Sequence, residues 1–149
     1  MADTSTQSIK VHAPLARVAA VICDFASYPQ WAEAMKQVEV LSEYEDGYAA
    51  EVRFVIDAGV LADDYTLEYS YADDISRIEW HLVEPSKIQK RQDGSYDIAA
   101  GADGTSTVTY SLSVDLSMGM FGMFRSKAEK MIMDSALRDL KRRVESLSP

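Results

Sequence analysis

The sequence predicts an α+β fold, in which a seven-stranded antiparallel sheet wraps around one long C-terminal helix and two short helices lie between the first and second strands. From Gln37 onward, apolar and polar residues alternate for about eighty residues, as in strands that are buried on one face. Residues 118–147 then change to a helical period with one apolar stripe. The short connections make the sheet antiparallel, and we expect the long helix to cover its dry face.

The first quarter of the chain contains the first strand and both short helices. Residues 7–12 alternate as a half-buried strand. Pro14 suits the first position of a helix, which we expect to end near residues 24–26. A capping box then opens a second, shorter helix, predicted over 27–36.

The middle of the chain is predicted to be a meander of six strands. An Asp-Gly pair at 46–47 is a strong hairpin signal, and residues 101–104 form a later turn. The polar segment 84–94 favours a loop without a defined register. The predicted strands are 38–42, 50–58, 65–72, 78–82, a short one around 96–98, and 107–116.

Length and composition fit a single domain over residues 1–149, with 47% apolar and 26% charged residues. A net charge of −9 argues against nucleic-acid binding, because phosphate contacts dominate that affinity. We find no leader pattern and no apolar run long enough to span a membrane, so a cytoplasmic location without stable membrane insertion is expected. The single cysteine, Cys23, lies among apolar residues, which favours a buried side chain over a reactive thiol. We expect no disulfide, metal or cofactor.

The tail helix is basic, whereas the rest of the chain is acidic. Its lysines and arginines lie away from the apolar stripe, which is compatible with contact to a lipid surface. They also complement the helix dipole and offer the ordinary pairs Asp134–Arg138 and Asp139–Arg143. The second interpretation requires no membrane.

Five stretches carry a resemblance to a known family: residues 9–14, 24–31, 93–96, 107–110 and 136–141. They resemble the bacterial polyketide cyclase/dehydrase and lipid-transport branch of the START, or Bet v 1-like, superfamily. The resemblance covers nearly the whole chain. It implies a helix-grip fold with an elongated hydrophobic pocket between the sheet and the tail helix, and the family shares this cavity rather than a fixed set of catalytic residues.

Binding or transport of a hydrophobic small molecule, lipid-like or aromatic, is the function that the resemblance favours. The alternative is an enzyme, a polyketide cyclase, aromatase or dehydratase that uses the same cavity to orient its substrate. A third possibility is docking on a partner, as in the coenzyme-Q-binding and ribosome-associated members of the superfamily.

The dry face of the predicted sheet supports a cavity independently, because it is rich in tyrosine and tryptophan. A core built for stability alone favours Leu, Ile and Val, and a buried tyrosine hydroxyl needs a partner. Some of these tyrosines are also compatible with positions at the rim, in contact with solvent. The predicted cavity residues are Phe54, Ile56, Tyr65, Leu67, Tyr69, Trp80, Tyr96, Tyr110, Leu112, Glu129, Met133 and Leu137.

Glu129 interrupts the apolar stripe of the tail helix. If it faces the cavity unpaired, burial raises its pKa and makes it a candidate general acid or base, or an anchor for a ligand hydroxyl. If Arg125 or a tyrosine of the sheet holds its carboxylate, it has no chemical role.

Two apolar segments are candidates for a portal to the cavity. Val60 and Leu61 lie at a hairpin tip, and Met120, Phe121 and Phe124 lie where the tail helix begins. The same residues are also compatible with a plug at the end of the cavity or with a homodimer contact.

Overall fold

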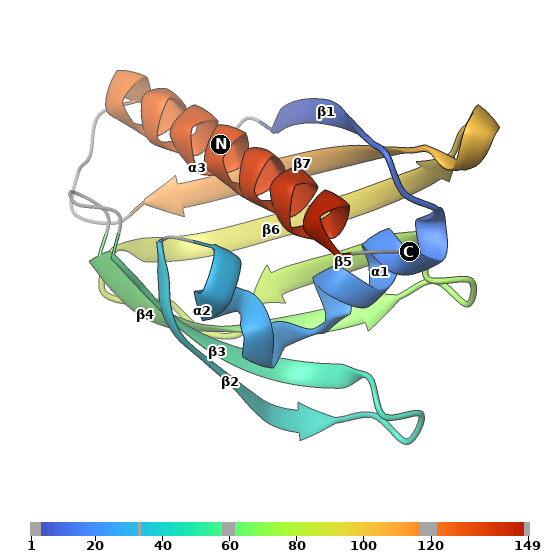
Figure 1. The fold of residues 1–149 in the computed structure, drawn as a ribbon. Coiled ribbons are helices and arrows are strands. Elements are labelled where there is room, and N and C mark those ends of the chain that lie inside the picture. The colour runs from blue at the N-terminus through green and yellow to red at the C-terminus, as the bar shows by residue number, and fades with distance from the viewer. Residues whose placement is uncertain (1–3, 33, 58–61, 117–121, 148–149) are drawn as a thin grey trace.

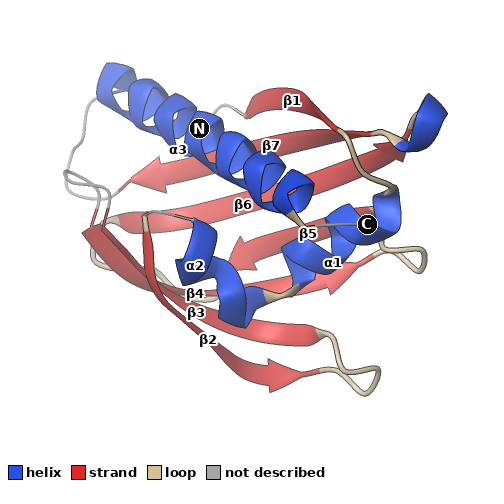
Figure 2. Cartoon of the chain, in the orientation of Figure 1, coloured by secondary structure: helices blue, strands red, loops and turns tan. Residues whose placement is uncertain are grey.

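We describe the protein from a computed structural model, which covers residues 4–32, 34–57, 62–116 and 122–147; the side chains of 116 and 122–129 are outside the description. The predicted α+β architecture is confirmed (Figure 2). The strands are β1 (Ser5–Val11), β2 (Met35–Glu43), β3 (Ala49–Asp57), β4 (Ala62–Tyr71), β5 (Arg77–Leu82), β6 (Gln89–Ala100) and β7 (Ser106–Leu116). The helices are α1 (Leu15–Cys23), α2 (Tyr28–Trp31) and α3 (Gly122–Ser146), with short 3-10 turns η1 (Phe25–Ser27) and η2 (Ala102–Gly104).

All seven strands belong to one antiparallel sheet in the order β1-β7-β6-β5-β4-β3-β2. Consecutive strands from β2 to β7 are therefore neighbours, and β1 joins the far edge beside β7. The sheet curves, and α3 crosses its concave side (Figure 1). Helix α2 lies on the same side beside β2, and α1 lies near the C-terminal end of α3 and contacts β6.

Strand β5 shows why the sheet has one dry face. Its inward side chains, Ile78 and Trp80, are 0% and 6% exposed, whereas the alternate residues Arg77, Glu79 and His81 are exposed. Successive side chains of a strand point to opposite faces, so the apolar-polar alternation becomes an inside and an outside. The same rule gives every strand of the meander an inward face toward α3.

The second short helix is much shorter than predicted. Residues 32–36 were expected to be helical, but α2 ends at Trp31 and β2 begins at Met35, which pairs with Ile56 of β3. The backbone hydrogen bonds between β2, at the edge of the sheet, and β3 outweigh a weak local preference for helix. The correction brings Met35 and Lys36 to the wall of the cavity described below.

The segment 84–94 was predicted to be a loop, but β6 begins at Gln89. Its register with β7 shifts between Gln89 and Arg91, then runs regularly from Gln92 opposite Val114. The polar composition concealed a strand whose inward residues, Gln89 and Gln92, are buried. This correction is important for the functional site.

Helix α3 buries the predicted apolar stripe, with Met133, Leu137, Leu140 and Val144 all in the core. Its C-terminal part is tied to the rest of the fold by polar contacts. Lys141 Nζ donates to the Lys10 carbonyl at 2.9 Å, and the Glu145 carboxylate accepts from the His12 amide at 2.8 Å. Arg143 donates to Gln30 Oε1 at 3.2 Å, which links α3 to α2.

The charged face of α3 forms short-range pairs, although not the predicted ones. Asp134 pairs with Lys130 at 3.0 Å, and Asp139 pairs with Arg142 at 2.6 Å. The pair Lys141–Glu145 has a separation of 2.6 Å. Lys130, Lys141 and Arg142 are therefore each paired with a carboxylate of the same helix.

A candidate ligand-binding cavity

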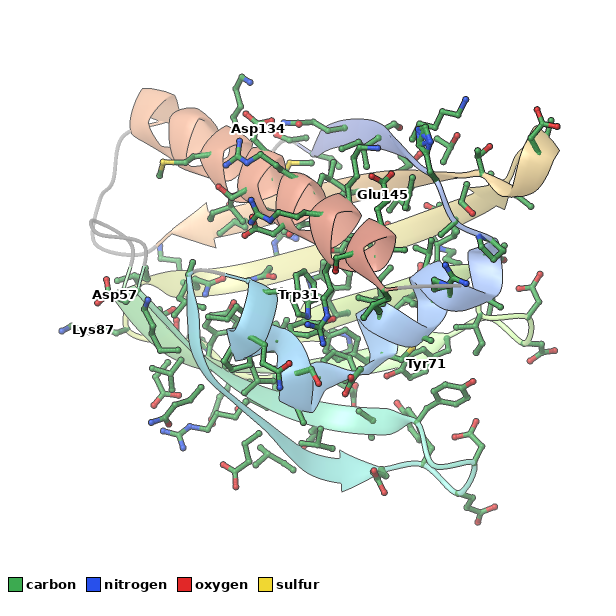
Figure 3. The ribbon with its side chains drawn as sticks, in the orientation of Figure 1. Trp31, Asp57, Tyr71, Lys87, Asp134 and Glu145 are labelled. Carbon is green, nitrogen blue, oxygen red and sulfur yellow. The ribbon has the colours of Figure 1, made fainter. Side chains whose placement is uncertain are left out.

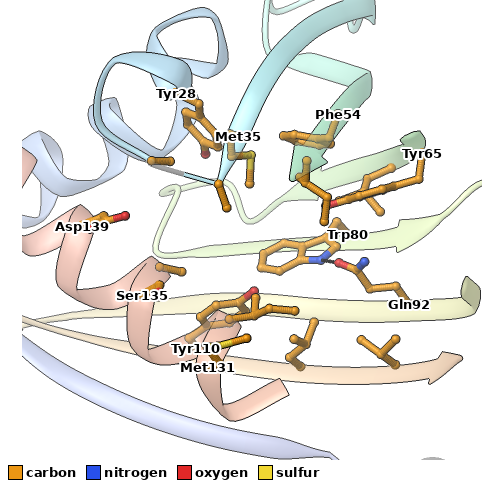
Figure 4. Close-up of a pocket in the computed structure, with 18 of the residues that line it drawn as sticks. Tyr28, Met35, Phe54, Tyr65, Trp80, Gln92, Tyr110, Met131, Ser135 and Asp139 are labelled. Atoms are coloured by element: carbon orange, nitrogen blue, oxygen red, sulfur yellow. Dashed lines mark hydrogen bonds between the residues drawn. The ribbon is translucent and has the colours of Figure 1, made fainter. Parts of the chain in front are cut away.

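A cavity of about 410 Å³ lies between the concave face of the sheet and helix α3 (Figure 4). Its size is within the usual range of ligand pockets, roughly 300–1,000 Å³. Side chains from β2 to β7, α2 and α3, together with residues of the connecting segments, form its wall. The described lining residues are Tyr28, Ala32, Ala34, Met35, Lys36, Phe54, Ile56, Asp57, Tyr65, Leu67, Tyr69, Trp80, Ile88, Gln89, Gln92, Tyr96, Tyr110, Leu112, Val114, Met131, Ile132, Ser135, Ala136, Arg138 and Asp139.

Nine of the predicted cavity residues lie in this wall, all of them on the sheet. They are Phe54, Ile56, Tyr65, Leu67, Tyr69, Trp80, Tyr96, Tyr110 and Leu112. The strand alternation predicts their shared face, and the curvature of the sheet brings them around one space.

The two described helix residues on the predicted list, Met133 and Leu137, are in the packed core and are not among the described lining residues. The cavity is lined instead by Ile132, Ser135 and Asp139. At 3.6 residues per turn, Ile132 and Asp139 lie about 100–120° around the helix from the apolar stripe. A helical wheel identifies the stripe that packs most tightly, and here that stripe lies against the core beside the cavity.

The remaining predictions for this region fall outside the description. Val60, Leu61, Met120 and Phe121 are not among the described residues, and the side chains of Phe124 and Glu129 are not described. The predicted portal and the chemical role of Glu129 therefore stay predictions.

Trp80 forms the middle of the cavity floor, and Gly94 is the reason it can lie there. The two residues are opposite each other on β5 and β6. A Cβ atom at Gly94 would lie 2.3 Å from both Cε2 and Cζ2 of the indole, far inside contact distance. The ring therefore lies across the backbone of β6, and its Nε1 reaches Gln92 Oε1 at 2.9 Å (Figure 4).

A chain of buried polar side chains continues from Trp80 along the start of β6. Gln92 Nε2 donates to Gln89 Oε1 at 2.6 Å, and Gln89 Nε2 donates to Asp63 Oδ2 at 2.9 Å. Ser86 Oγ donates to the same carboxylate oxygen at 2.5 Å. Gln92, Gln89 and Asp63 are each less than 9% exposed, which is unusual for polar side chains beside an apolar cavity.

Five tyrosine hydroxyls are among the other polar groups of the wall. The Tyr28 hydroxyl donates to the Ile22 carbonyl. Within the described part of the chain, the hydroxyls of Tyr69 and Tyr96 have no hydrogen-bond partner. Burial raises the pKa of Tyr28, Tyr65, Tyr69 and Tyr96 above the ordinary value, so all four stay protonated at neutral pH.

Charged residues line one rim of the cavity. Lys36 and Asp57 lie on β2 and β3, and Asp57 lies at the same end of the molecule as Lys87 (Figure 3). Arg138 of α3 also contributes to the wall. Among the described side chains, no group of three or more His, Cys, Asp or Glu is placed to hold a metal ion.

Cys23 is partly buried at the end of α1. Burial raises the pKa of its thiol to about 11, so the unreactive protonated form dominates at neutral pH. None of the helices in the described part of the chain is long and apolar enough to cross a membrane.

Sequence reasoning did not identify Gln89 and Gln92 as cavity residues, or Gly94 and Asp63 as residues that contact the wall from behind. Gln89, Gln92 and Gly94 lie in the segment that was predicted to be a loop, and Asp63 lies outside the predicted strands. One signal was available. If the two-residue alternation of the strand is counted from Tyr96 toward the N-terminus, Gly94 and Gln92 also point to the dry face. The contact between Asp63 and Gln89 joins two hairpins and has no signature in the sequence.

These features define a class of protein: a curved antiparallel sheet that, with a long C-terminal helix, encloses a largely aromatic cavity. Residues 2–145 match the model of the family described as polyketide cyclase / dehydrase and lipid transport, and the chain belongs to this family. No curated protein gives a significant match to the sequence.

Solved structures show the same fold at low sequence identity. A START superfamily protein from Mycobacterium smegmatis is 20% identical, with a TM-score of 0.90 over 97% of this chain and 99% of that one. The Zhui aromatase/cyclase from Streptomyces sp. R1128 is 15% identical, with a TM-score of 0.87 over 97% and 94%. A protein from Thermus thermophilus is 20% identical, with a TM-score of 0.81 over 99% and 100%.

Proposed function

We propose that the protein binds a hydrophobic small molecule that contains an aromatic ring, in the cavity between the sheet and α3. The observation that carries this proposal is the wall itself: a space of about 410 Å³ bordered by the rings of Phe54, Tyr65, Tyr69, Trp80 and Tyr96. Aromatic rings are stabilised by offset or edge contacts with other rings. A planar ligand gains such contacts from several directions here.

The polar groups of the wall support binding in preference to a role in packing alone. The Tyr69 and Tyr96 side chains line the cavity, and their hydroxyls have no partner within the described residues. Phenylalanine would fill the same space if the residues served only for packing. A ligand oxygen supplies the missing acceptor.

An enzyme of the polyketide cyclase or dehydrase type remains the alternative, supported by the family and by the fold shared with an aromatase/cyclase. The raised pKa values of the tyrosines suit them to donate hydrogen bonds and orient a substrate, and make them poor proton acceptors at neutral pH. Proton transfer then falls to the candidate Glu129. If Glu129→Gln leaves turnover of a cyclase substrate unchanged, Glu129 has no part in the mechanism.

Titration with isopropenylnaphthalene tests binding directly. We expect a saturable change in tryptophan fluorescence, because Trp80 lies in the wall. Ala136→Phe places a ring in the cavity from α3 and should weaken binding at least tenfold. Ala99→Phe, on an exposed position of β6, is the matched control and should leave binding unchanged.

Native mass spectrometry of protein purified from cells is a second test. A non-covalent hydrophobic adduct is expected in the wild type and is expected to be reduced in Ala136→Phe. Absence of any adduct, together with no binding of the naphthalene probe, would refute the proposal. A cytoplasmic location and a homodimer stay predictions, which fractionation and sedimentation can test.

A further inference from the structure

Three residues of α3 line the outer edge of the cavity. Met131, Ser135 and Arg138 recur at i, i+4 and i+7, which places them on one side of the helix. Figure 4 shows the first two of them on the side of α3 that borders the cavity. Met131 is 44% exposed, Ser135 is half-buried and Arg138 is exposed. Because these side chains both line the cavity and touch solvent, a ligand beside them can keep one end in water.

Arg138 differs from its neighbours on α3 in its partners. Lys130, Lys141 and Arg142 each pair with a carboxylate of the helix. Within the described residues, Arg138 has no such pair, and its hydrogen bond is a long one, from Nη2 to Ser135 Oγ at 3.5 Å. A guanidinium carries several N–H donors, so most of those of Arg138 are available to a ligand.

The contact with Ser135 shows where the guanidinium lies. Side chains of a helix lean toward its N-terminus, and Arg138 reaches back along the outer edge of the cavity to the preceding turn. The Ser135 oxygen accepts this contact, so its hydroxyl hydrogen is the group that it can offer to another acceptor. Two donors therefore meet at one point of the cavity wall, and a negatively charged oxygen is the acceptor that binds them most strongly.

The acidic residues of the wall leave this positive charge in place. The described charged residues of the wall are Lys36, Asp57, Arg138 and Asp139. Asp139 pairs at 2.6 Å with Arg142, which is not among the described lining residues. Lys36 and Asp57 are opposite charges on the neighbouring strands β2 and β3. Among these described charges, that of Arg138 is therefore the one that remains for a ligand.

We propose that Arg138, together with Ser135, binds a carboxylate of the ligand at the outer edge of the cavity, and that the ligand is an aromatic acid whose ring lies among the aromatic side chains of the sheet. The inference rests on the proposed function, because it concerns a ligand in the same cavity. The planar fork of a guanidinium matches the two oxygens of a carboxylate. At the edge, the carboxylate also avoids the desolvation cost that it has deeper in an apolar cavity.

Two probes of similar shape test the subsite. Naphthoate and isopropenylnaphthalene, substituted at the same ring position, both carry a small planar group and differ in charge. We expect the wild type to bind naphthoate at least as tightly as the neutral probe at neutral pH, whereas a wholly apolar cavity favours the neutral one. Weaker binding of naphthoate would overturn the subsite and leave the proposed function standing, and binding of neither probe would refute both.

Variants then locate the preference. Arg138→Gln should lower the ratio of naphthoate affinity to isopropenylnaphthalene affinity about threefold to tenfold, as expected for a charged hydrogen bond at an exposed site. Ser135→Ala should lower it less. Lys130→Gln is the matched control, because it removes the same charge from the same helix, but Lys130 pairs with Asp134 at 3.0 Å and is not among the described lining residues.

Three outcomes contradict the proposal. An unchanged ratio in Arg138→Gln, as expected if the side chain serves a lipid surface instead, would overturn it. An equal loss in Lys130→Gln would show general attraction between charges and no subsite. Tighter binding of naphthylmethylammonium than of naphthoate would show that the acidic residues of the wall dominate. Arg138→Lys keeps the charge without the planar fork, and we expect it to retain part of the preference.

Discussion

The two faces of the sheet accommodate polar groups in opposite ways. The outer face contains exposed ion pairs between neighbouring strands, such as Arg77 with Asp97 at 2.6 Å. The inner face contains few polar groups, but Gln89, Gln92 and Asp63 are almost fully buried and joined in one chain. Exposed pairs are screened and replaceable, whereas each buried group requires a partner. Polar groups on the inner face are therefore the more informative about function.

Alkaline pH should have the largest effect on stability, and it acts through the inner face. The pKa values of Tyr28, Tyr65, Tyr69 and Tyr96 are raised in the folded protein, and they return to about 10 on unfolding. Stability is therefore complete below about pH 10 and is lost as the pH rises above that value, because the unfolded state releases protons first.

Absorbance of tyrosinate and circular dichroism, recorded against pH, test this expectation. These four tyrosines should ionise together with unfolding. If they ionise near their ordinary pKa while the fold stays intact, the inner face is more accessible than the structure indicates.

The substitution Ile78→Ala should cost about 2–4 kcal/mol in the free energy of unfolding. Ile78 is completely buried, so its truncation removes apolar contacts and leaves a void. Urea denaturation measures the loss. If Ile78→Ala lowers the free energy of unfolding by less than Arg77→Gln does, the inner face does not contribute more to stability than the outer face.

Gly94→Ala should cost about 1–3 kcal/mol, the usual range for inserting an atom into a packed site. Its Cβ would collide with the indole of Trp80, which must move and release Gln92. Thermal unfolding measures the cost, and titration with isopropenylnaphthalene should show weaker binding. Gly47→Ala is not a suitable comparison because its φ is +91°; Ser95→Ala, the next residue of β6, is the control for the strand itself.

Arg77→Gln should have the smallest effect, less than about 1 kcal/mol, although it removes contacts to both Asp97 and Glu79. The side chain is 46% exposed, and water and salt compensate for the lost pairs. Urea denaturation at low and high salt measures the change in the free energy of unfolding. A larger effect that disappears in high salt would show that the outer ion pairs act as a network.

Most of the fold was predictable because it depends on patterns along the chain. Alternation places Ile78 and Trp80 on one face and Arg77 and Glu79 on the other, and the helical stripe identifies Leu140 as a core residue. The prediction was wrong at residues 32–36 and at the start of β6, where pairing with a neighbouring strand outweighs local preference.

The sequence by itself determined which side chains share the inner face, because the two-residue period of a strand is a local property of the backbone. Only the tertiary structure decided which side of α3 borders the cavity, how Trp80 lies over Gly94, and that Asp63 of one hairpin meets Gln89 of another. These outcomes depend on the curvature of the sheet and on contacts between residues distant along the chain. Periodicity cannot encode such contacts.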